Sequence, residues 1–181
     1  MRGLMIRCAL PCIFLLACSI GSILPTSSYV RPTPTIMNCG QTMNSDLEMN
    51  LITRINKERT DHGLRALTVQ PALITAARGH SADMACNNNF SSTGTDGSTW
   101  HEWMVGAGYL VTYGQVNTFA GSEDPSAVLT GVTSSEPASQ NILDPKVVDL
   151  GVGYAQRDGT KYKSYWTILL AIPSAFNNLP K

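Results

Sequence analysis

The sequence predicts an α+β fold in which helices cover a mainly antiparallel sheet. Two amphipathic helical segments come early in the chain, before the strand-like segments. Two segments rich in β-branched and aromatic residues come late, and a tight-turn signal separates them. The length that follows the N-terminal segment suits a single domain with one core.

The two early helices have clear start and stop signals. Ser45 and Glu48 form a capping box, apolar residues then recur at helical spacing, and Gly63 is a stop. Pro71 is typical of the first turn of a second helix, which ends at the asparagine run 87–89. One face of this second helix is expected to be buried; it holds Leu73, Ala77, His80, Ser81 and Met84.

Shorter elements follow a turn-rich loop at 93–98, whose Gly and Asp residues tolerate the backbone angles of tight turns. We expect, in order, a helix at 99–105, a strand at 110–119, a helix start at 125–130, and strands at 147–154 and 162–172. Asp158-Gly159, between the last two strands, is a hairpin turn signal.

The first 18 residues are typical of an export signal. Arg2 and Arg7 form a basic region, and the apolar core after it contains a proline and is too short to span a bilayer. Residues 15–18, Leu-Leu-Ala-Cys, resemble a bacterial lipobox, in which Cys18 becomes the acylated first residue of a lipoprotein. The alternative is ordinary cleavage near residues 19–22, which discards Cys18. We favour lipidation, because a small residue stands directly before the Cys at the end of the apolar core.

Four parts are expected along the chain. The signal at 1–18 is followed by a Pro/Ser/Thr-rich tether and N-terminal segment at 19–44, a domain at 45–175 and a tail at 176–181. The prolines of the tether favour extended backbone, which suits a spacer between a membrane and a domain. A disordered N-terminus with no spacer role is the alternative.

The charge balance narrows the range of partners. The chain carries 13 basic and 13 acidic side chains, and removing Arg2 and Arg7 with the signal leaves 11 against 13, a net charge of −2. There is no basic face and no polybasic run. We therefore expect no nucleic-acid partner, a membrane contact only through the lipid anchor, and a monomer.

The cysteines support export. Cys39 and Cys86 are the two that remain once the leader is set aside, and an even pair in an oxidising compartment is most simply a disulfide. Two unpaired thiols are the alternative. By the loop-entropy model, closing the span between them would stabilise the fold by roughly 4 kcal/mol.

No catalytic set is visible in the residues themselves. His101-Glu102 lacks the second His of a zinc-protease motif, since Val105 stands there. His80, on the apolar face of its helix, is interpreted as a packed histidine that hydrogen-bonds a neighbour. No serine lies in a G-x-S-x-G elbow, and no phosphate-binding glycine loop is present.

Four stretches carry a resemblance to a known family. They are LITRINKERTDHGLRAL at 51–67, AARGHSADMACNNNFSSTGTDGS at 76–98, NIL at 141–143, and DLGVGY at 149–154 with YWT at 165–167. Together, from Leu47 to Ile172 and in consistent order, they resemble the bacterial branch of the CAP superfamily, which includes cysteine-rich secretory, antigen-5 and plant pathogenesis-related proteins. The resemblance implies a three-layer α-β-α sandwich, in agreement with the element order above.

In many members of that superfamily a central cleft carries two histidines and two acidic residues that can hold a divalent metal. Matched by motif, Ser92 stands at the first His position and Ala138 at the second. The first acidic position falls on Gln115 or Val116, depending on register, and the second falls on Asp149. One carboxylate cannot hold zinc at useful affinity, so we expect no bound metal and no cofactor.

These substitutions bear on function. Proposals that CAP domains are hydrolases depend on the cleft tetrad, so we favour a non-enzymatic, extracytoplasmic protein that binds a small apolar ligand or an envelope partner at the cell surface. One alternative is a hydrolase with a non-standard site in the same cleft, which needs His80 or His101 to reach Ser92 or Asp149. The other is a structural envelope protein. A group of large side chains is interpreted as core packing rather than as the wall of a groove; it comprises Trp100, Trp103, Met104 and Tyr109.

Overall fold

The fold is described from a computed structural model, which describes residues 36–175 of the chain. The elements are α1 (Ser45–Asp61), β1 (Thr68–Val69), α2 (Pro71–Asn87), α3 (Trp100–Gly106), β2 (Val111–Ala120), α4 (Pro125–Thr133), α5 (Ala138–Ile142), β3 (Asp149–Gln156) and β4 (Ser164–Pro173). Every helix and strand expected from the sequence is present, with ends shifted by a few residues. The predicted signal with Cys18, most of the tether and the tail lie outside the described residues.

The sheet has four strands in the order β1-β3-β4-β2. Strand β4 pairs antiparallel with both β3 and β2, and the short β1 adds a parallel pair to the other side of β3. The sheet is therefore mainly antiparallel, as the sequence predicts. The Asp158-Gly159 signal lies in the β3–β4 connection, where Gly159 has a φ of +79°, a backbone angle that glycine adopts without strain.

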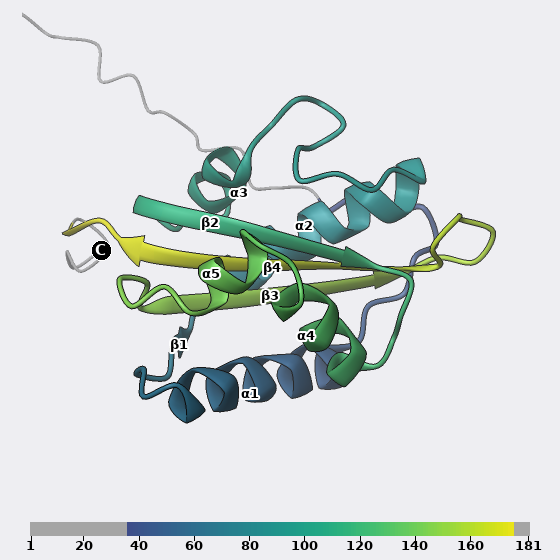
Figure 1. Cartoon of the computed structure of the whole chain (residues 1–181). Helices are drawn as coiled ribbons and strands as arrows, with labels where there is room; N and C mark the ends of the chain where they lie inside the picture. The colour runs from purple at the N-terminus through teal and green to yellow at the C-terminus, as the bar shows by residue number, and fades with distance from the viewer. Residues whose placement is uncertain (1–35, 176–181) are drawn as a thin grey trace, which may run out of the picture. The chain divides into compact units, whose positions relative to one another are not determined.

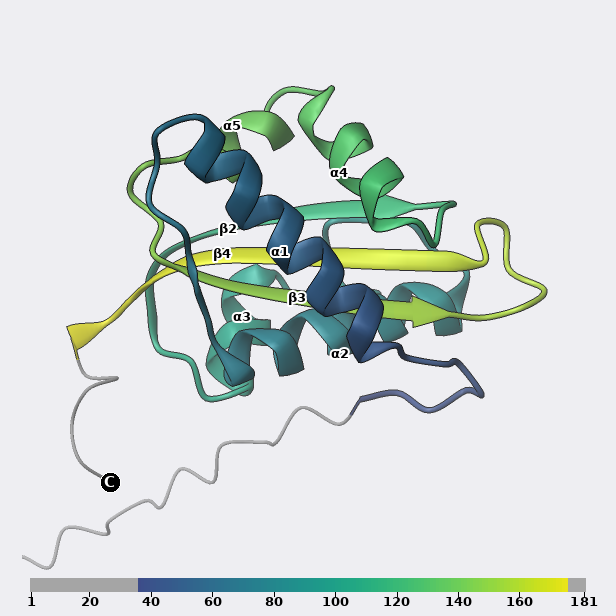
Figure 2. The same cartoon turned by 90° about the horizontal axis from the view of Figure 1, so that it is seen from below.

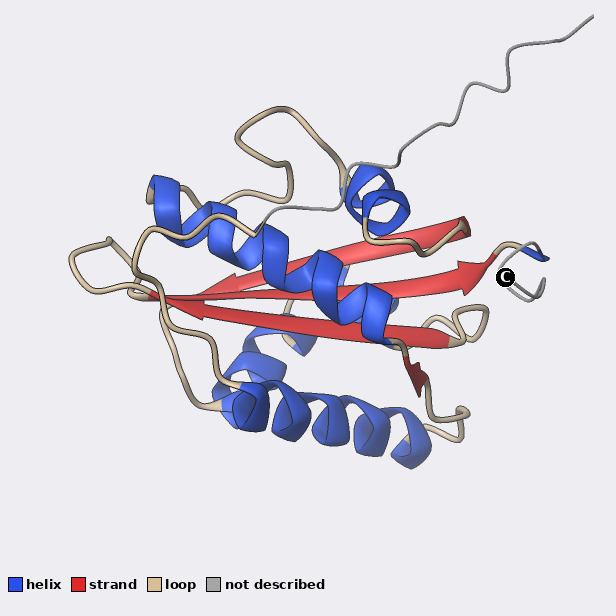
Figure 3. Cartoon of the chain, turned by 180° about the vertical axis from the view of Figure 1, so that it is seen from behind, coloured by secondary structure: helices blue, strands red, loops and turns tan. Residues whose placement is uncertain are grey.

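Helices cover both faces of this sheet. Helix α1 crosses β3 and β4 on one face, with α4 and α5 beside it over β2 (Figure 2). Helices α2 and α3 lie on the other face (Figures 1 and 3). This is the three-layer α-β-α sandwich that the resemblance implied.

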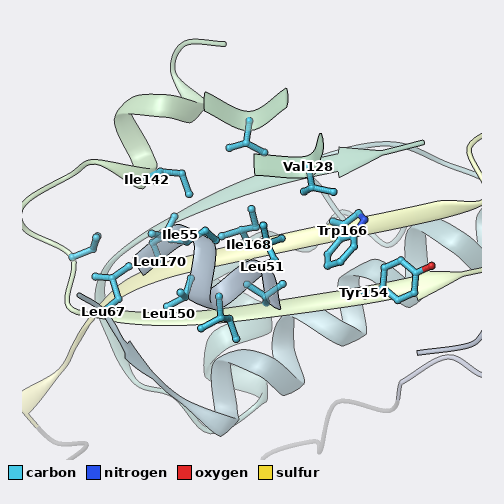
Figure 4. Packing of buried hydrophobic residues seen from close by; sticks show 14 residues of the cluster. Leu51, Ile55, Leu67, Val128, Ile142, Leu150, Tyr154, Trp166, Ile168 and Leu170 are labelled. Carbon is cyan, nitrogen blue, oxygen red and sulfur yellow. The ribbon is translucent and has the colours of Figure 1, made fainter. Parts of the chain in front are cut away.

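Side chains that alternate along the strands fill the two interlayer spaces. On β3, Leu150, Val152 and Tyr154 pack with α1 and α4 in the larger cluster, which Figure 4 shows. Gly151 and Gly153 point to the opposite face, where a Cβ on either one would lie inside van der Waals contact of the α2 backbone. The DLGVGY motif therefore lets α2 pack directly on the β3 backbone.

Three local features differ from the sequence-based expectation. The N-cap residue of α1 is Asn44, whose side-chain oxygen accepts from the backbone amides of Asp46 and Leu47. The prediction of a capping box at Ser45 and Glu48 is therefore wrong. Asn and Ser are nearly equal N-cap residues, and the chain uses the one that leaves Glu48 free for another contact. Strand β1 and helix α5 were not predicted, because two and five residues are too few to show a period.

The predicted disulfide is present. Cys39 and Cys86 are bonded, which ties the segment before α1 to the end of α2. Across the described part of the chain, no helix is both long and apolar enough to span a membrane.

Candidate functional site

A cleft of about 610 Å³ opens between β2 and α5. It is lined by Tyr113, Gln115, Glu136, Ser139, Gln140, Asn141, Leu143, Asp144, Pro145 and Lys146. Gln115, a family-cleft position by the resemblance, is among these residues; Ala138, the second His position, begins α5 next to the lining residue Ser139 but is not itself part of the lining. This is the candidate functional site, called the β2–α5 cleft below.

An amide, a phenol and a carboxylate meet in the β2–α5 cleft. Gln115 Nε2 donates to Tyr113 Oη at 2.6 Å and to Asp144 Oδ2 at 3.1 Å. Tyr113 Oη donates to the same carboxylate oxygen at 3.1 Å. Burial, and then the hydrogen bond to Asp144, raises the pKa of Tyr113, so its phenol stays a neutral donor at physiological pH.

The oxygen of the Gln115 amide, unlike its nitrogen, has no partner among the described residues. Gln115 Oε1 is buried and has no hydrogen bond within the described residues. A buried amide oxygen without a donor costs free energy of about 1–3 kcal/mol. Gln115 itself lines the β2–α5 cleft, so a residue of this cleft carries an acceptor that the described part of the chain leaves unsatisfied.

Two amides and an arginine hold α5 and its following loop against the sheet. Asn117 Nδ2 donates to the Ala138 carbonyl at 3.1 Å, and Asn141 Nδ2 donates to Asn117 Oδ1 at 2.8 Å. The buried guanidinium of Arg59 donates to the carbonyls of Ile142 and Asp144, at 2.6 and 3.0 Å. Charge-assisted bonds of this kind fix the loop that carries the Asp144 carboxylate.

The remaining family positions do not gather in this cleft. Gln115 pairs with Leu170 of β4, whereas Asp149 of β3 pairs with Ala171, whose side chain lies on the α2 face. Asp149 therefore faces the opposite side of the sheet, where it accepts from Tyr109 Oη at 2.7 Å and Gln70 Nε2 at 3.1 Å.

Val116 and Ser92 also lie away from the cleft floor. Val116 packs in the cluster below α2 and α3, so Gln115 is the one of the two register candidates that faces the cleft. Ser92 is exposed in the loop after α2 and is absent from the cleft lining.

The side chains at these positions do not fit a zinc ion. Gln115 offers an amide whose nitrogen is already committed to Tyr113 and Asp144, and Ala138 offers a methyl group. Within residues 36–175, no three His, Cys, Asp or Glu side chains lie close enough together to hold a metal. Zinc in proteins takes imidazole, thiolate and carboxylate ligands, so the absence of bound zinc stays our expectation.

The histidines that a hydrolase would need are engaged elsewhere. His80 Nδ1 contacts Thr167 Oγ1 at 3.1 Å, which is the neighbour contact expected for a packed histidine. His101 is exposed and makes an edge contact with Trp100. In the described part of the chain, no hydrogen bond joins either histidine to Ser92 or Asp149.

The core interpretation of the large side chains after the 93–98 loop is confirmed for Met104 and Tyr109, which are buried. Trp100 lies against Gly114 of β2, and Trp103 stacks on His80.

The sequence patterns did not single out two residues of the cleft as functional. Tyr113 was only part of an expected strand, and Asp144 was only one residue past the NIL motif. The alternation of Tyr113 with Gln115 along β2 was a usable signal, because residues two apart in a strand share a face. Nothing local pointed to Asp144, which Arg59 brings to the cleft from 85 residues away.

Comparisons with known proteins agree with this architecture. Residues 52–170 match the model of the cysteine-rich secretory protein family, CAP. The YkwD protein of Bacillus subtilis (strain 168) is 28% identical over 123 residues, which are 68% of this chain and 46% of YkwD. The chain thus spans about half the length of that relative.

Solved structures share the fold. An extracellular SCP-domain protein of Bacillus anthracis aligns with a TM-score of 0.63 and 24% identity, over 70% of this chain and 40% of its own. An outer surface protein of Borrelia burgdorferi aligns with a TM-score of 0.67 and 12% identity, over 74% and 98%. A cysteine-rich secretory protein of Staphylococcus aureus aligns with a TM-score of 0.58 and 16% identity, over 71% and 38%. With a family model that covers most of the sandwich, this chain belongs to the cysteine-rich secretory protein (CAP) family.

Proposed function

We propose that this protein is an exported CAP domain that binds a partner at the cell surface through the β2–α5 cleft and catalyses no reaction there. Support for export comes from the basic and apolar leader, from the disulfide, and from the similarity in fold to an extracellular protein and an outer surface protein. Cys18 is proposed as the lipid anchor.

The observation that carries the proposal is the buried, unpaired Oε1 of Gln115. A partner that places an N–H or O–H at this oxygen removes the cost of leaving it unpaired. The neighbouring Tyr113 and Asp144 hold the Gln115 amide in one orientation, so the acceptor is preorganised.

A non-catalytic role follows from the chemistry of the lining. Among the described residues, no imidazole and no thiol lines the cleft, and the Asp144 carboxylate already accepts from Tyr113 and Gln115. A hydrolase needs a nucleophile beside a base or a metal-bound water, and neither arrangement is supported by the side chains at this position.

The lining favours a polar occupant over the small apolar ligand considered from the sequence. Most lining side chains are amides, hydroxyls or charged groups, and Glu136, Gln140 and Lys146 are exposed at the cleft. An apolar ligand would remove these groups from water without replacing their hydrogen bonds. We therefore propose a hydrogen-bonding envelope polymer as the partner.

The test is co-sedimentation with cell envelopes prepared from the source cells, with every protein purified in the Cys18→Ala background so that the proposed lipid anchor does not contribute to binding. Replacing Gln115→Met removes the amide at nearly constant side-chain length, and we expect affinity for envelopes to fall about tenfold. Gln156→Met, at the opposite end of the sheet, is the matched control and should bind like the unchanged chain.

Two outcomes of this experiment would contradict the proposal. Equal sedimentation of the Gln115→Met and unchanged proteins would show that the cleft is not the binding surface. Time-dependent release of soluble sugar or peptide fragments from the envelopes would favour the hydrolase alternative.

A further inference from the structure

The β2–α5 cleft contains an exposed aromatic ring, that of Tyr113. The large apolar side chains that are exposed in the described residues are Met37, Met49, Phe90 and Tyr113. Of these, Tyr113 is the one that lines the cleft, with 36% of its surface exposed. In the described part of the chain no second aromatic ring packs against it. The ring is therefore accessible to a ligand in the cleft.

The hydroxyl of Tyr113 holds this ring in one place. Its oxygen accepts from Gln115 Nε2 at 2.6 Å and donates to Asp144 Oδ2 at 3.1 Å. The carboxylate is itself fixed, because Asp144 Oδ1 accepts from the Lys146 backbone amide at 2.8 Å and Arg59 holds the Asp144 carbonyl at 3.0 Å. Since the hydroxyl proton is already used, Tyr113 mainly offers a ligand the face of its ring, in a fixed orientation.

Hydrogen-bond donors and acceptors both line the cleft with this ring. Lys146 is exposed, and its ammonium group makes no ion pair or hydrogen bond within residues 36–175. Glu136 Oε2 accepts from Gln140 Nε2 at 3.0 Å, which leaves Glu136 Oε1 and the Gln140 side-chain oxygen to accept from a ligand. A ligand that only donates or only accepts would match part of this set and leave the rest unpaired.

A sugar ring has the chemistry that matches an aromatic face beside mixed donors and acceptors. Each sugar hydroxyl both donates and accepts, so it pairs with ammonium, amide and carboxylate groups alike. The C–H bonds on one face of a pyranose carry partial positive charge, and the negative face of an aromatic ring attracts them. The cleft volume of about 610 Å³ lies within the range of about 300–1,000 Å³ that is usual for ligand sites.

We propose that the β2–α5 cleft binds a glycan chain, with one pyranose stacked on Tyr113 and its hydroxyls bonded to Lys146, Glu136 and Gln140. This inference rests on the proposed function and names the class of the envelope polymer. Glycans with and without acetamido groups share this ring chemistry, so the experiment includes one of each.

The test is a titration of the chain, followed by NMR, in the Cys18→Ala background of the envelope experiment. The probes are cellotetraose and tetra-N-acetylchitotetraose, which differ in the acetamido group, and tetra-alanine is the peptide comparison. We expect saturable binding of sugar and none of the peptide at the same concentration. Binding of both sugars would assign recognition to the pyranose ring, and binding of the acetylated one alone would add the acetamido group.

A direct readout of stacking comes from the sugar protons. The ring current of Tyr113 should shift the C–H protons of the stacked pyranose upfield, and this shift should vanish in Tyr113→Ala. Loss of a hydrogen bond elsewhere in the cleft would not produce that signature.

Variants locate the site. Tyr113 is exposed, so Tyr113→Ala should keep the fold and weaken sugar binding about tenfold. Tyr113→Phe keeps the ring but loses the two hydrogen bonds that orient it, and we expect a smaller loss of about threefold. Phe90→Ala, which removes an exposed ring outside the cleft lining, is the matched control and should bind like the unchanged chain.

Three outcomes would overturn the glycan assignment. They are no saturable binding of either sugar, saturable binding of tetra-alanine instead, and equal losses in Tyr113→Ala and Phe90→Ala. If Gln115→Met still lowers affinity for envelopes in any of these cases, the cleft remains the binding surface and only the class of partner is wrong. The two proposals therefore fail separately.

Discussion

Glu48 shows how one side chain can connect three elements. It lies on α1 with 2% of its surface exposed, and its carboxylate accepts from the Arg78 guanidinium of α2 at 3.0 Å. It also accepts from the Tyr154 backbone N–H at 3.0 Å. Strand β1 pairs only with the first two residues of β3. The edge of β3 is therefore not covered by a strand at Tyr154. Glu48 closes this edge, which would otherwise leave a buried amide unpaired.

Replacing Glu48→Gln is expected to lower the free energy of unfolding by about 2–3 kcal/mol, because Arg78 loses its counter-charge at a largely buried site. Urea unfolding followed by circular dichroism measures the change. Asp61→Asn is the control, since the Asp61–Lys57 pair is exposed and should contribute less than about 0.5 kcal/mol. Equal losses of unfolding free energy in Glu48→Gln and Asp61→Asn would show that the contribution of Glu48 to stability does not depend on its burial.

At the scale of elements, the contact between α2 and β3 depends on two glycines. Gly151 and Gly153 face α2. The nearest atoms to an added Cβ are the Leu73 Cβ and backbone atoms of Leu73, Ile74, Ala77 and Arg78. Backbone cannot rotate away as a flexible side chain can. The short distance also brings Ser81 to the Gly153 carbonyl, which orders the hydrogen-bond chain that ends at His80.

Gly153→Ala is expected to lower the free energy of unfolding by about 3 kcal/mol, since the methyl group forces α2 away from the sheet. Gly79→Ala is the matched control on α2. No atom lies within 4 Å of a Cβ added there, so helix propensity should raise stability by about 0.5–1 kcal/mol. Thermal or urea unfolding of both variants checks the pair, and a Gly153→Ala protein as stable as the unchanged chain would refute the packing argument.

At the scale of the whole molecule, two links fix the position of the segment that precedes α1. The Cys39–Cys86 disulfide and the Thr42–Gln156 backbone bridge hold the segment before α1 against the end of α2 and the end of β3. The chain that precedes this segment carries the proposed anchor, Cys18.

Cys18→Ala is expected to move the protein from the membrane fraction to the soluble extracytoplasmic fraction, because one acylated residue is proposed as the sole membrane attachment. Fractionation followed by immunoblotting measures the shift, and labelling with a fatty-acid analogue checks that the label is lost. Cys12→Ala, elsewhere in the predicted leader, is the control, since it removes a cysteine without breaking the Cys39–Cys86 disulfide. Unchanged membrane fractionation of Cys18→Ala would contradict lipidation.

The elements that the sequence predicts well are those with local signals. Pro71 begins α2, Asn88 ends it at a φ of +49°, and Gly63 follows α1 at +73°, all from rules that act within one helical turn. The order of two helices before a late hairpin was enough for the α+β class. The DLGVGY motif and its neighbours carry the resemblance to the family, because they are local patterns that need no contact between distant segments.

The functional surfaces depend on contacts between distant segments. Motif matching names Gln115 and Asp149 as cleft positions, yet pairing with adjacent residues of β4 puts them on opposite faces of the sheet. Asp144 reaches the cleft through Arg59, and His80 meets Trp103 through the packing of α3 on α2. Local sequence determines which backbone conformation a segment adopts, whereas strand register and helix packing determine which side chains meet, because those contacts form only when the whole core is buried.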